Sequence, residues 1–353
     1  MADVNTKFKI DELTENNPYT IKAEDYFNTS EEEYDNFDTQ SWNKGKGYSC
    51  PNFPIFDEKM EGLEDGLYLF AAESNMGKSA LMSNLLFDYC TSEENNLFGV
   101  YFSLDDTKNE MIPRLISMLE LIPISVCSKP KRYQDAIDNG EENSSTYTEW
   151  LEKRQHGIQR LKELKNRFKI EDAEKLDCGE KILDYCKKLK DYLKGYDPNA
   201  NLIIAIDSLF DLNFPSKNFK SDKEKNEFIA QEIKRWAKTE IKAPIFGTIH
   251  LRKIDKRRAD ISDVKESGRY VYDASVVFLL HNDVSRNGQN ASIYNTSPDT
   301  EEFLPIIEIQ WAKNKKSSFK GITYCNLIPN FSKVTECTLE QMQRFNNLRY
   351  SSK

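Results

Sequence analysis

The residues of this sequence best suited to chemistry are Gly77, Lys78 and Ser79, in the run AAESNMGKSA. An apolar stretch, GLYLFAA, leads into them, and an amphipathic stretch, SALMSNLLFDYC, follows. A loop that joins a strand to a helix offers backbone N–H groups and the positive end of the helix dipole to an anion. The lysine would reach the outer phosphates of a nucleotide, and the serine hydroxyl would help to hold Mg²⁺. The pattern predicts that ATP and Mg²⁺ are bound by Ser74, Asn75, Met76, Gly77, Lys78, Ser79 and Ala80.

This phosphate-binding pattern departs from its general form at one position, because Ala72 stands where a glycine is usual. Gly77 is retained at the point where a side chain would collide with a phosphate. The alternative is a chance Gly-Lys-Ser at the start of a helix. The succession of strand, loop and helix favours the phosphate-binding interpretation.

Carboxylates follow two further apolar runs. Residues 202–207 (LIIAID) end in Asp207, which is typical of the aspartate that supports Mg²⁺ in such sites. The run VYFSLDD ends in Asp105 and Asp106, where a carboxylate could polarise the water that attacks the terminal phosphate. The alternative is that one of the two caps the helix that follows. We favour Asp105 as the water activator.

The elements that must position these residues alternate along the chain. Short apolar runs predict strands at 67–71, 98–103, 168–171, 202–206, 244–249, 276–280, 306–311 and 322–327. Amphipathic runs predict helices at 79–90, 108–121, 147–166, 178–193 and 224–238, with a polar loop at 138–145. Strands separated by helices predict an α/β fold with a mostly parallel central sheet flanked by helices. The late strands, joined by short loops, favour an antiparallel extension.

Composition excludes some classes of protein. Of the 353 residues 39% are hydrophobic, which is enough for a substantial core. No stretch has the length of a membrane span, and the first residues are unlike a signal peptide, so we expect a cytoplasmic protein without a membrane partner. Seven scattered cysteines without a C-x-x-C pair disfavour structural zinc and disulfides. The net charge of −9 argues against a nucleic-acid partner, although binding depends on where the cations lie.

Charge and pattern divide the chain into three parts. Residues 1–48 are acidic, with seven carboxylates between Glu24 and Asp38, and are predicted to be a tail or linker. A helix at 31–42 is one interpretation of this part, and a disordered acidic tail is the other. Residues 49–340 are predicted to be the α/β domain, and residues 341–353 a C-terminal tail.

With these motifs in order, the chain resembles the ATPase domain of DnaB-type replicative helicases, from about residue 53 to residue 332. FPIFDEKMEGLEDGLYLFAAESNMGKSALMSNL resembles the family's entry and phosphate-binding segment. VYFSLDD and LIIAIDSLFDL resemble its catalytic and Mg²⁺-binding strands. DISDVKESGRYVYDASVVFLLHND carries K-E-S-G followed by D-A, a family hallmark, and IIEIQWAKNKKSSFKG resembles its closing strand.

The resemblance implies a RecA-like P-loop ATPase that assembles as a homohexameric ring around single-stranded DNA and unwinds duplex DNA during replication, in the 5′-to-3′ direction. It implies a bacterial or phage-infected bacterial cell, and a primase or a helicase loader as partner. The family's N-terminal helical domain would not fit in residues 1–48, although a helix at 31–42 could grip the neighbouring subunit. Carried over by position, Lys78, Asp105, Asp207, His250, Lys313 and Lys315 are the catalytic set, the last two acting across the subunit boundary.

The DNA contacts are expected in a basic loop and the K-E-S-G motif, because a ring helicase binds phosphates rather than bases. Alone, such a charged run is more often a solvated loop. In the family that the chain resembles, the segment between the strand 244–249 and K-E-S-G faces the pore, so the resemblance favours DNA binding by this run. The expected DNA-binding residues are Arg252, Lys253, Lys256, Arg257, Arg258, Lys265, Glu266 and Gly268.

Three catalytic positions depart from the family pattern. Asp105 replaces a glutamate and is one methylene shorter, and His250 replaces a glutamine. Lys315 replaces an arginine and lacks its planar fork. These departures support a second hypothesis, a slow RecA-like ATPase that acts as an ATP-gated assembly or regulatory subunit without unwinding.

Overall fold

The structure, a computed structural model, describes residues 31–43, 47–254, 257–264, 268–296 and 302–351. The chain divides into two units, Met1–Gly47 and Tyr48–Lys353. In the first unit the structure describes one helix, α2 (Glu31–Asn43), at the position where the sequence predicts one. The aromatic side chains of Tyr34, Phe37 and Trp42 on this helix are exposed.

The second unit is built on a sheet of ten strands in the order β10-β9-β8-β6-β1-β5-β4-β2-β3, with β7 paired to β8. The strands are β1 (Gly66–Ala72), β2 (Leu97–Ser103), β3 (Phe168–Asp172), β4 (Asn201–Asp207), β5 (Pro244–His250), β6 (Val276–Asn282), β7 (Tyr294–Thr296), β8 (Phe303–Asn314), β9 (Ile322–Ile328) and β10 (Lys333–Glu336). β1 to β6 pair in parallel, and β7 to β10 extend the sheet in antiparallel pairing. The predicted mostly parallel sheet with an antiparallel extension is therefore confirmed.

Both faces of the sheet are buried, which explains why its strands are apolar throughout. Along β1 the side chains alternate, because successive residues of a strand point to opposite faces. Tyr68 and Phe70 enter one core, and Leu67 and Leu69 enter the other. A parallel sheet needs a layer of helices on each side to cover such strands.

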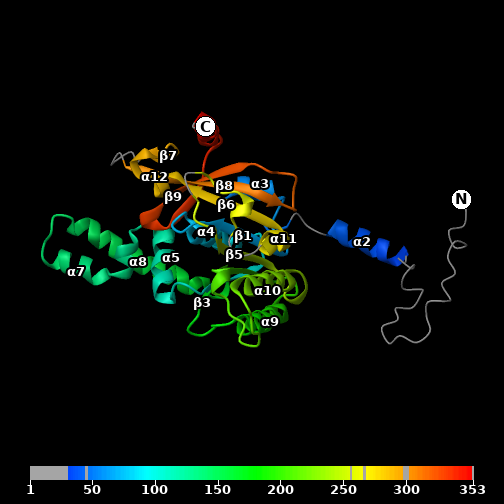
Figure 1. The fold of residues 1–353 in the computed structure, drawn as a ribbon. Coiled ribbons are helices and arrows are strands. Elements are labelled where there is room, and N and C mark those ends of the chain that lie inside the picture. Colours follow the sequence, from blue (N-terminus) through cyan, green and yellow to red (C-terminus); the bar gives the residue numbers. More distant parts are fainter. Residues whose placement is uncertain (1–30, 44–46, 255–256, 265–267, 297–301, 352–353) are drawn as a thin grey trace, which may run out of the picture. The chain divides into compact units, whose positions relative to one another are not determined.

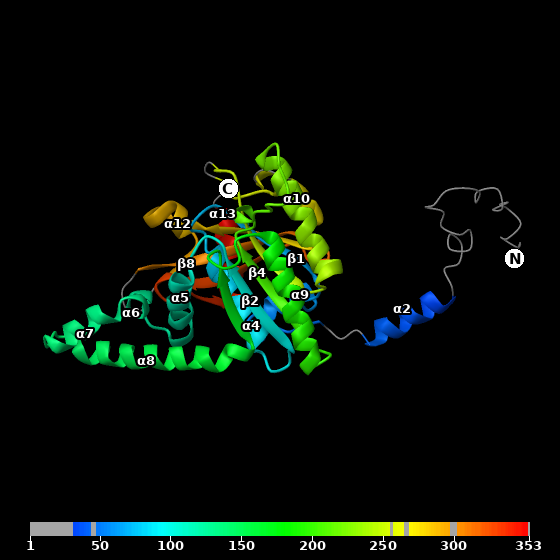
Figure 2. The same ribbon diagram turned by 90° about the horizontal axis from the view of Figure 1, so that it is seen from below.

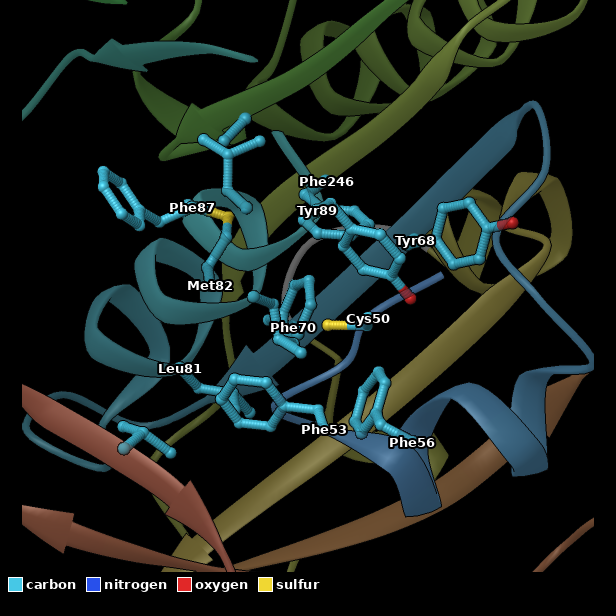
Figure 3. Close-up of a cluster of buried hydrophobic side chains, with 14 of the residues drawn as sticks. Cys50, Phe53, Phe56, Tyr68, Phe70, Leu81, Met82, Phe87, Tyr89 and Phe246 are labelled. Carbon is cyan, nitrogen blue, oxygen red and sulfur yellow. The ribbon is translucent and has the colours of Figure 1, made fainter. Parts of the chain in front are cut away.

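Helices form those two layers (Figures 1 and 2). The first face is covered by α3 (Pro54–Met60), α4 (Lys78–Thr91) and α5 (Lys108–Glu120). The second is covered by α9 (Gly179–Tyr196), α10 (Asp222–Arg235) and α11 (Gly268–Asp273). Figure 3 shows the first core, in which Phe53, Phe56 and Phe70 gather beside Cys50 and Tyr89. All seven cysteines are buried and free, as small apolar side chains would be.

Three helices between β2 and β3 form an arm that extends away from the sheet (Figures 1 and 2). They are α6 (Ile124–Ser128), α7 (Pro130–Asp138) and α8 (Ser144–Glu163). The sequence predicts α8 and the loop before it, but not α6 or α7. The arm has its own small core, in which Ile116, Ile122, Val126 and Cys127 pack against Trp150 and Ile158. His156 on α8 is exposed and pairs with Glu120 at 2.9 Å.

The last described residues of the chain form a helix. Residues predicted as a C-terminal tail lie largely in α13 (Leu339–Ser351). Phe345 on this helix is fully buried against Tyr324 and Ile306 of the antiparallel strands. A short helix, α12 (Asp283–Asn287), follows β6. Within the described part of the chain, no helix combines the length and apolar character that crossing a membrane requires.

Candidate nucleotide-binding site

Four of the six predicted catalytic residues, Lys78, Asp105, Asp207 and His250, meet at one edge of the sheet. In parallel strands all carboxyl ends lie at the same edge, which is where such folds place their ligands. The strand register puts His250 beside Ala72, and Asp207 beside Ser103. The phosphate loop leaves the end of β1, and Asp105 follows the end of β2. The fold therefore brings together four elements that are far apart in the sequence.

The phosphate loop opens α4 through a glycine that no other residue could easily replace. Gly77 has a φ of 92°, and a Cβ atom there would come within 2.7 Å of Ile307. Lys78 is 8% exposed, and its Nζ donates hydrogen bonds to the carbonyl oxygens of Glu73 at 2.7 Å and Ala72 at 3.2 Å. Burial lowers the pKa of Lys78, and the carboxylates of Asp207 and Glu73 oppose that shift. The amine thus lies within the loop, ready to exchange carbonyl partners for phosphate oxygens.

Asp207 is held by two hydroxyl groups from neighbouring strands. Tyr101 Oη donates to its Oδ2 at 2.6 Å, and Thr248 Oγ1 donates to its Oδ1. Tyr101 and Thr248 are both buried, so they fix the carboxylate without reaching the ligand themselves. An oriented carboxylate and a serine hydroxyl at the start of α4 are ligand types that suit a hard cation preferring oxygen. Ser79 and Asp207 therefore fit Mg²⁺.

Asp105 is exposed at the mouth of the site and has no ion pair among the described residues. Partial burial raises its pKa, and the nearby carboxylates of Asp211, Asp106 and Asp207 add to the shift. Asp106 instead pairs with Arg114 at 2.5 Å. Neither aspartate caps α5, because Thr107 and Glu110 form that capping box. The structure thus removes the helix-capping alternative for Asp105.

His250 lies at the end of β5, half-buried, with its ring centroid 6.0 Å from that of Phe210. Burial lowers the pKa of His250, and the positive charge of Lys78 lowers it further. The carboxylates of Asp211, Asp207 and Asp105 act in the opposite direction. A neutral imidazole beside the phosphate loop can still donate one hydrogen bond to an oxygen of the ligand.

A cavity of about 300 Å³ opens from the phosphate loop. Its lining runs from Gly77, Lys78 and Ser79 along one side of α5, where Met111, Arg114 and Met118 lie, to Pro329 and Ser332. This volume is enough for the phosphates and part of a nucleoside. Arg114 brings a guanidinium group to the wall, and the sequence did not single it out.

Lys313 and Lys315 lie at the opposite edge of the sheet. β8 runs antiparallel to β6, so that Lys313 pairs with Val277 near the amino end of β6, whereas Ile307 pairs with Asn282 at its carboxyl end. A seven-residue strand spans roughly 20 Å. Lys313 Nζ donates to the carbonyl oxygens of Val271 and Tyr272, at 2.5 and 2.8 Å. Burial and the neighbouring Lys315 lower the pKa of Lys313 to about 8. Neither lysine reaches the phosphate loop of its own chain.

The basic segment that follows β5 divides into exposed and paired residues. Arg252 and Lys253 are exposed. Arg257 forms two hydrogen bonds of 2.6 Å with Asp263. Arg258 forms a fork with Glu308 on β8, at 2.7 and 2.8 Å, and Glu308 is 2% exposed. Arg258 is predicted to bind DNA, but in the structure its guanidinium group neutralises the buried carboxylate of Glu308.

The K-E-S-G motif lies mostly outside the described residues. Lys265 and Glu266 fall there, and so does Lys256 of the basic segment. Gly268 is described, exposed at the start of α11. The roles predicted for these four residues stay predictions.

Sequence reasoning missed the groups that support the site. Tyr101 and Thr248 sit inside apolar strands, two residues before each strand ends, and that position is the signal that could have revealed them. Glu73 and Arg286 are 213 residues apart and form an ion pair of 2.6 Å, which no local pattern predicts.

Comparisons with known proteins agree with this geometry. The family model described as "DnaB-like helicase C terminal domain" matches residues 51–327. The replicative DNA helicase DnaB of Leifsonia xyli subsp. xyli (strain CTCB07) is 25% identical over 280 residues, which are 77% of this chain and 55% of that protein. A probable replicative DNA helicase of Trieres chinensis is 27% identical over 295 residues, 82% of this chain and 57% of that protein. This chain spans just over half the length of these relatives.

Solved structures show the same fold. One of them, described as an ATPase domain, superposes with a TM-score of 0.67 at 20% identity, over 87% of this chain and 98% of that one. A DnaB-like replicative helicase, solved with its interactions with primase, superposes with a TM-score of 0.64 at 19% identity, over 87% of this chain and 66% of that one. The predicted RecA-like α/β fold is confirmed.

Proposed function

This chain belongs to the DnaB-like helicase C terminal domain family, and from that membership we propose that it is an ATP-driven motor. It translocates on single-stranded DNA and unwinds duplex DNA during replication, in the 5′-to-3′ direction. The observation that carries the proposal is the meeting of the phosphate loop, Asp207, Asp105 and His250 at one edge of the sheet. That arrangement holds a nucleoside triphosphate beside a carboxylate positioned to activate water.

In this proposal each residue has a separate task. Lys78 binds the outer phosphates, and Ser79 with Asp207 holds Mg²⁺, which neutralises charge on the phosphates when bound. Asp105 accepts a proton from the attacking water. His250 donates a hydrogen bond to the terminal phosphate, so the position of the end of β5 depends on whether that phosphate is bound.

The site is completed by a second copy of the chain. Lys313 and Lys315 lie across the sheet from the phosphate loop, so they serve the site of a neighbour rather than their own. A ring of identical subunits, a hexamer by resemblance, gives every site such a neighbour. The exposed aromatic side chains of α2 (Tyr34, Phe37 and Trp42) supply an apolar contact for an adjacent subunit. A primase or a loader would bind the assembled ring.

The experiment that tests the proposal is steady-state ATP hydrolysis with and without single-stranded DNA, followed by unwinding of forked duplexes that carry one tail of either polarity. We expect DNA to stimulate hydrolysis at least about tenfold, and unwinding only from the 5′ tail. The Lys78→Ala protein is the zero-rate reference. Hydrolysis that DNA does not change, with no unwinding from either tail, would contradict the motor.

The second candidate is a slow ATPase that acts as an ATP-gated assembly or regulatory subunit. The identities of Asp105, His250 and Lys315 favour it, because each offers weaker transition-state contacts than glutamate, glutamine and arginine would. Its signature is tight ATP binding and ATP-dependent assembly with hydrolysis near zero. Mass measurement in solution with ATP, with ADP and without nucleotide, beside the hydrolysis assay, separates the two candidates.

A further inference from the structure

The phosphate loop is tied to the basic segment by the side chain of Glu73. Glu73 Oε1 accepts a hydrogen bond from the backbone N–H of Ile254 at 2.8 Å, and Oε2 pairs with Arg286 Nη2 at 2.6 Å. The side chains of Glu73 and Arg286 are 19% and 15% exposed. A carboxylate with two charge-assisted or backbone donors, shielded from water, is a strong connection.

Arg286 extends the same connection from α12. Its Nη1 donates to the carbonyl oxygen of Arg257 at 2.7 Å, and its Nη2 to that of Ile254 at 2.5 Å. The next residue back, Ser285, donates its Oγ to the carbonyl oxygen of Asn75 at 2.9 Å. The short helix α12 therefore contacts the phosphate loop at Glu73 and Asn75. It also contacts the basic segment at Ile254 and Arg257.

A phosphate that binds Lys78 would change the hydrogen bonds of the phosphate-loop backbone at Ala72 and Glu73. Lys78 Nζ donates to the carbonyl oxygens of Glu73 and Ala72. The N–H of Leu251, where the basic segment leaves β5, also donates to Ala72, at 3.2 Å. Phosphate oxygens are stronger acceptors for an ammonium group than peptide carbonyls are. When Lys78 turns to a phosphate, the carbonyl oxygens of Ala72 and Glu73 lose their cationic partner.

We propose that Glu73 and Arg286 are positioning residues that transmit nucleotide occupancy from the phosphate loop to the described parts of the basic segment, residues 252–254 and 257–258. Neither side chain lines the cavity at the phosphate loop. In the structure Lys78 donates to the carbonyl oxygen of Glu73, and Glu73 and Arg286 together hold Ile254. With nucleotide bound, the shift of the Glu73 peptide changes the position of the segment and of the exposed Arg252 and Lys253. The effect on DNA rests on the proposed function; the mechanical link does not.

The link is tested first without DNA, by hydrogen exchange of the peptide 249–254 with no nucleotide, with ADP and with a non-hydrolysable ATP analogue. We expect exchange in the full-length wild-type protein to differ by about fivefold or more between empty and analogue-bound states. In Arg286→Gln and in Glu73→Gln we expect that difference to vanish. Arg286→Lys keeps the charge but not the fork, so it should retain part of it. A wild-type difference that survives in both glutamine variants would overturn the proposal.

A matched control is Arg344→Gln, which removes an arginine that also donates to a backbone carbonyl, that of Tyr294 on β7. It should exchange like the wild type. Circular dichroism verifies that each variant is folded, and the ATP dissociation constant of Arg286→Gln should stay within about threefold of wild type, because the arginine does not contact phosphate. Loss of ATP binding by Arg286→Gln would make it part of the nucleotide site and overturn the positioning role.

DNA affinity is measured separately, with a fluorescent oligothymidine in the same three nucleotide states. If the wild type binds DNA in no state, the proposed motor fails while the exchange result still decides the link. If the wild type binds DNA with an affinity that depends on nucleotide, Arg286→Gln should bring the affinities of the three states to within about twofold of one another. Nucleotide-dependent DNA affinity that persists in Arg286→Gln would overturn the transmission step.

Discussion

Tyr101 donates its hydroxyl proton to Oδ2 of Asp207 at 2.6 Å, from a position one strand away and fully inside the core. The hydroxyl has no path to solvent or ligand of its own, so its contribution is to aim the carboxylate. Thr248 does the same for the second oxygen from the other side. The orientation of the carboxylate in the proposed Mg²⁺ site is thus set by two neutral groups, which a search for charged residues does not find.

Tyr101→Phe should weaken Mg²⁺-dependent hydrolysis while leaving the fold intact. A hydrogen bond to a charged group contributes about 1.5–3 kcal/mol, which corresponds to roughly a 10- to 100-fold loss in kcat/KM. The measurement is the hydrolysis rate over a Mg²⁺ titration, in which half-saturation should move to higher concentration. Tyr185→Phe, which removes a hydroxyl from Glu171 elsewhere on the sheet, is the control and should behave like wild type. An unchanged Mg²⁺ titration for Tyr101→Phe would remove Asp207 from the metal site.

Asp105→Asn should lower kcat by about 100-fold or more, because it removes the proposed proton acceptor. Asp105→Glu should restore the reach of the longer side chain and equal or exceed the wild-type rate. Asp106→Asn is the neighbouring control, and since Asp106 pairs with Arg114 its effect should be much smaller. Equal losses in Asp105→Asn and Asp106→Asn would argue against a specific role for Asp105.

The raised pKa of Asp105 predicts how the rate of ATP hydrolysis falls at low pH. Since burial and neighbouring carboxylates raise the pKa of Asp105, the ionised base is lost as pH falls through a value above the ordinary one of about 3.9. The acid limb of kcat should therefore lie at higher pH than for an unperturbed aspartate. Asp211→Asn removes one of the carboxylates that raise the pKa, so it should move this limb to lower pH. No movement of the limb would assign it to another group.

Lys313 predicts a loss of activity in alkali. Its pKa of about 8 means that the amine is charged at about pH 7 and largely neutral at about pH 9. If its charge stabilises the transition state of a neighbour, DNA-stimulated hydrolysis should fall about tenfold across that range. Lys313→Arg stays charged throughout, so its rate should stay level. A wild-type alkaline limb that Lys313→Arg leaves unaltered would show that another group titrates, and circular dichroism at both pH values excludes unfolding.

Arg252 and Arg258 should separate binding from stability. Arg252→Ala should reduce the slope of log K against log salt for single-stranded DNA by about 1 and leave the free energy of unfolding unchanged, because the side chain is exposed. Arg258→Ala should instead lower the free energy of unfolding by about 3 kcal/mol, since it strips the buried Glu308 of its fork. The lower end of the usual range applies because Arg258 is partly exposed and Arg349 lies 3.7 Å from Glu308. The opposite result, a lower salt slope for Arg258→Ala and a lower free energy of unfolding for Arg252→Ala, would indicate that Arg258 contacts the DNA.

The parts of the site that the sequence predicts are those with a local signature. The phosphate loop, Asp207 and Asp105 each follow an apolar run, and the rule that parallel strands end at one edge brings them together. His250 and the two lysines came from resemblance, and the structure adds that the lysines lie at the far edge. The arm of α6 to α8 could be predicted only in part, because α7 has one buried residue, Ala136, and thus a weak apolar pattern.

What the sequence could not predict depends on contacts between distant segments. Arg258 and Glu308 are 50 residues apart, and each has the pattern of an ordinary exposed charge until the fold brings them together. The terminal residues around Phe345 have a polar composition typical of a tail, but Phe345 and Met342 pack against Ile306 and Tyr324 of the sheet and dock the helix there. Because Arg257 and Arg258 form ion pairs within the chain, the charged sequence pattern overestimates the number of cations available to DNA.

The position of Lys78 and Lys313 on opposite edges of one sheet bears on mixed populations of chains. In the proposed ring, a copy that lacks Lys313 would keep its own phosphate loop and impair the site of its neighbour, whereas a copy that lacks Lys78 would impair its own site. In a ring assembled at random from a mixture of subunits, either defect lowers activity by more than the fraction of defective copies. The reason is that each round of hydrolysis around the ring passes through the damaged subunit interface. Both variants should therefore behave as dominant over the wild type, and a small fraction of either in a cell should outweigh its abundance.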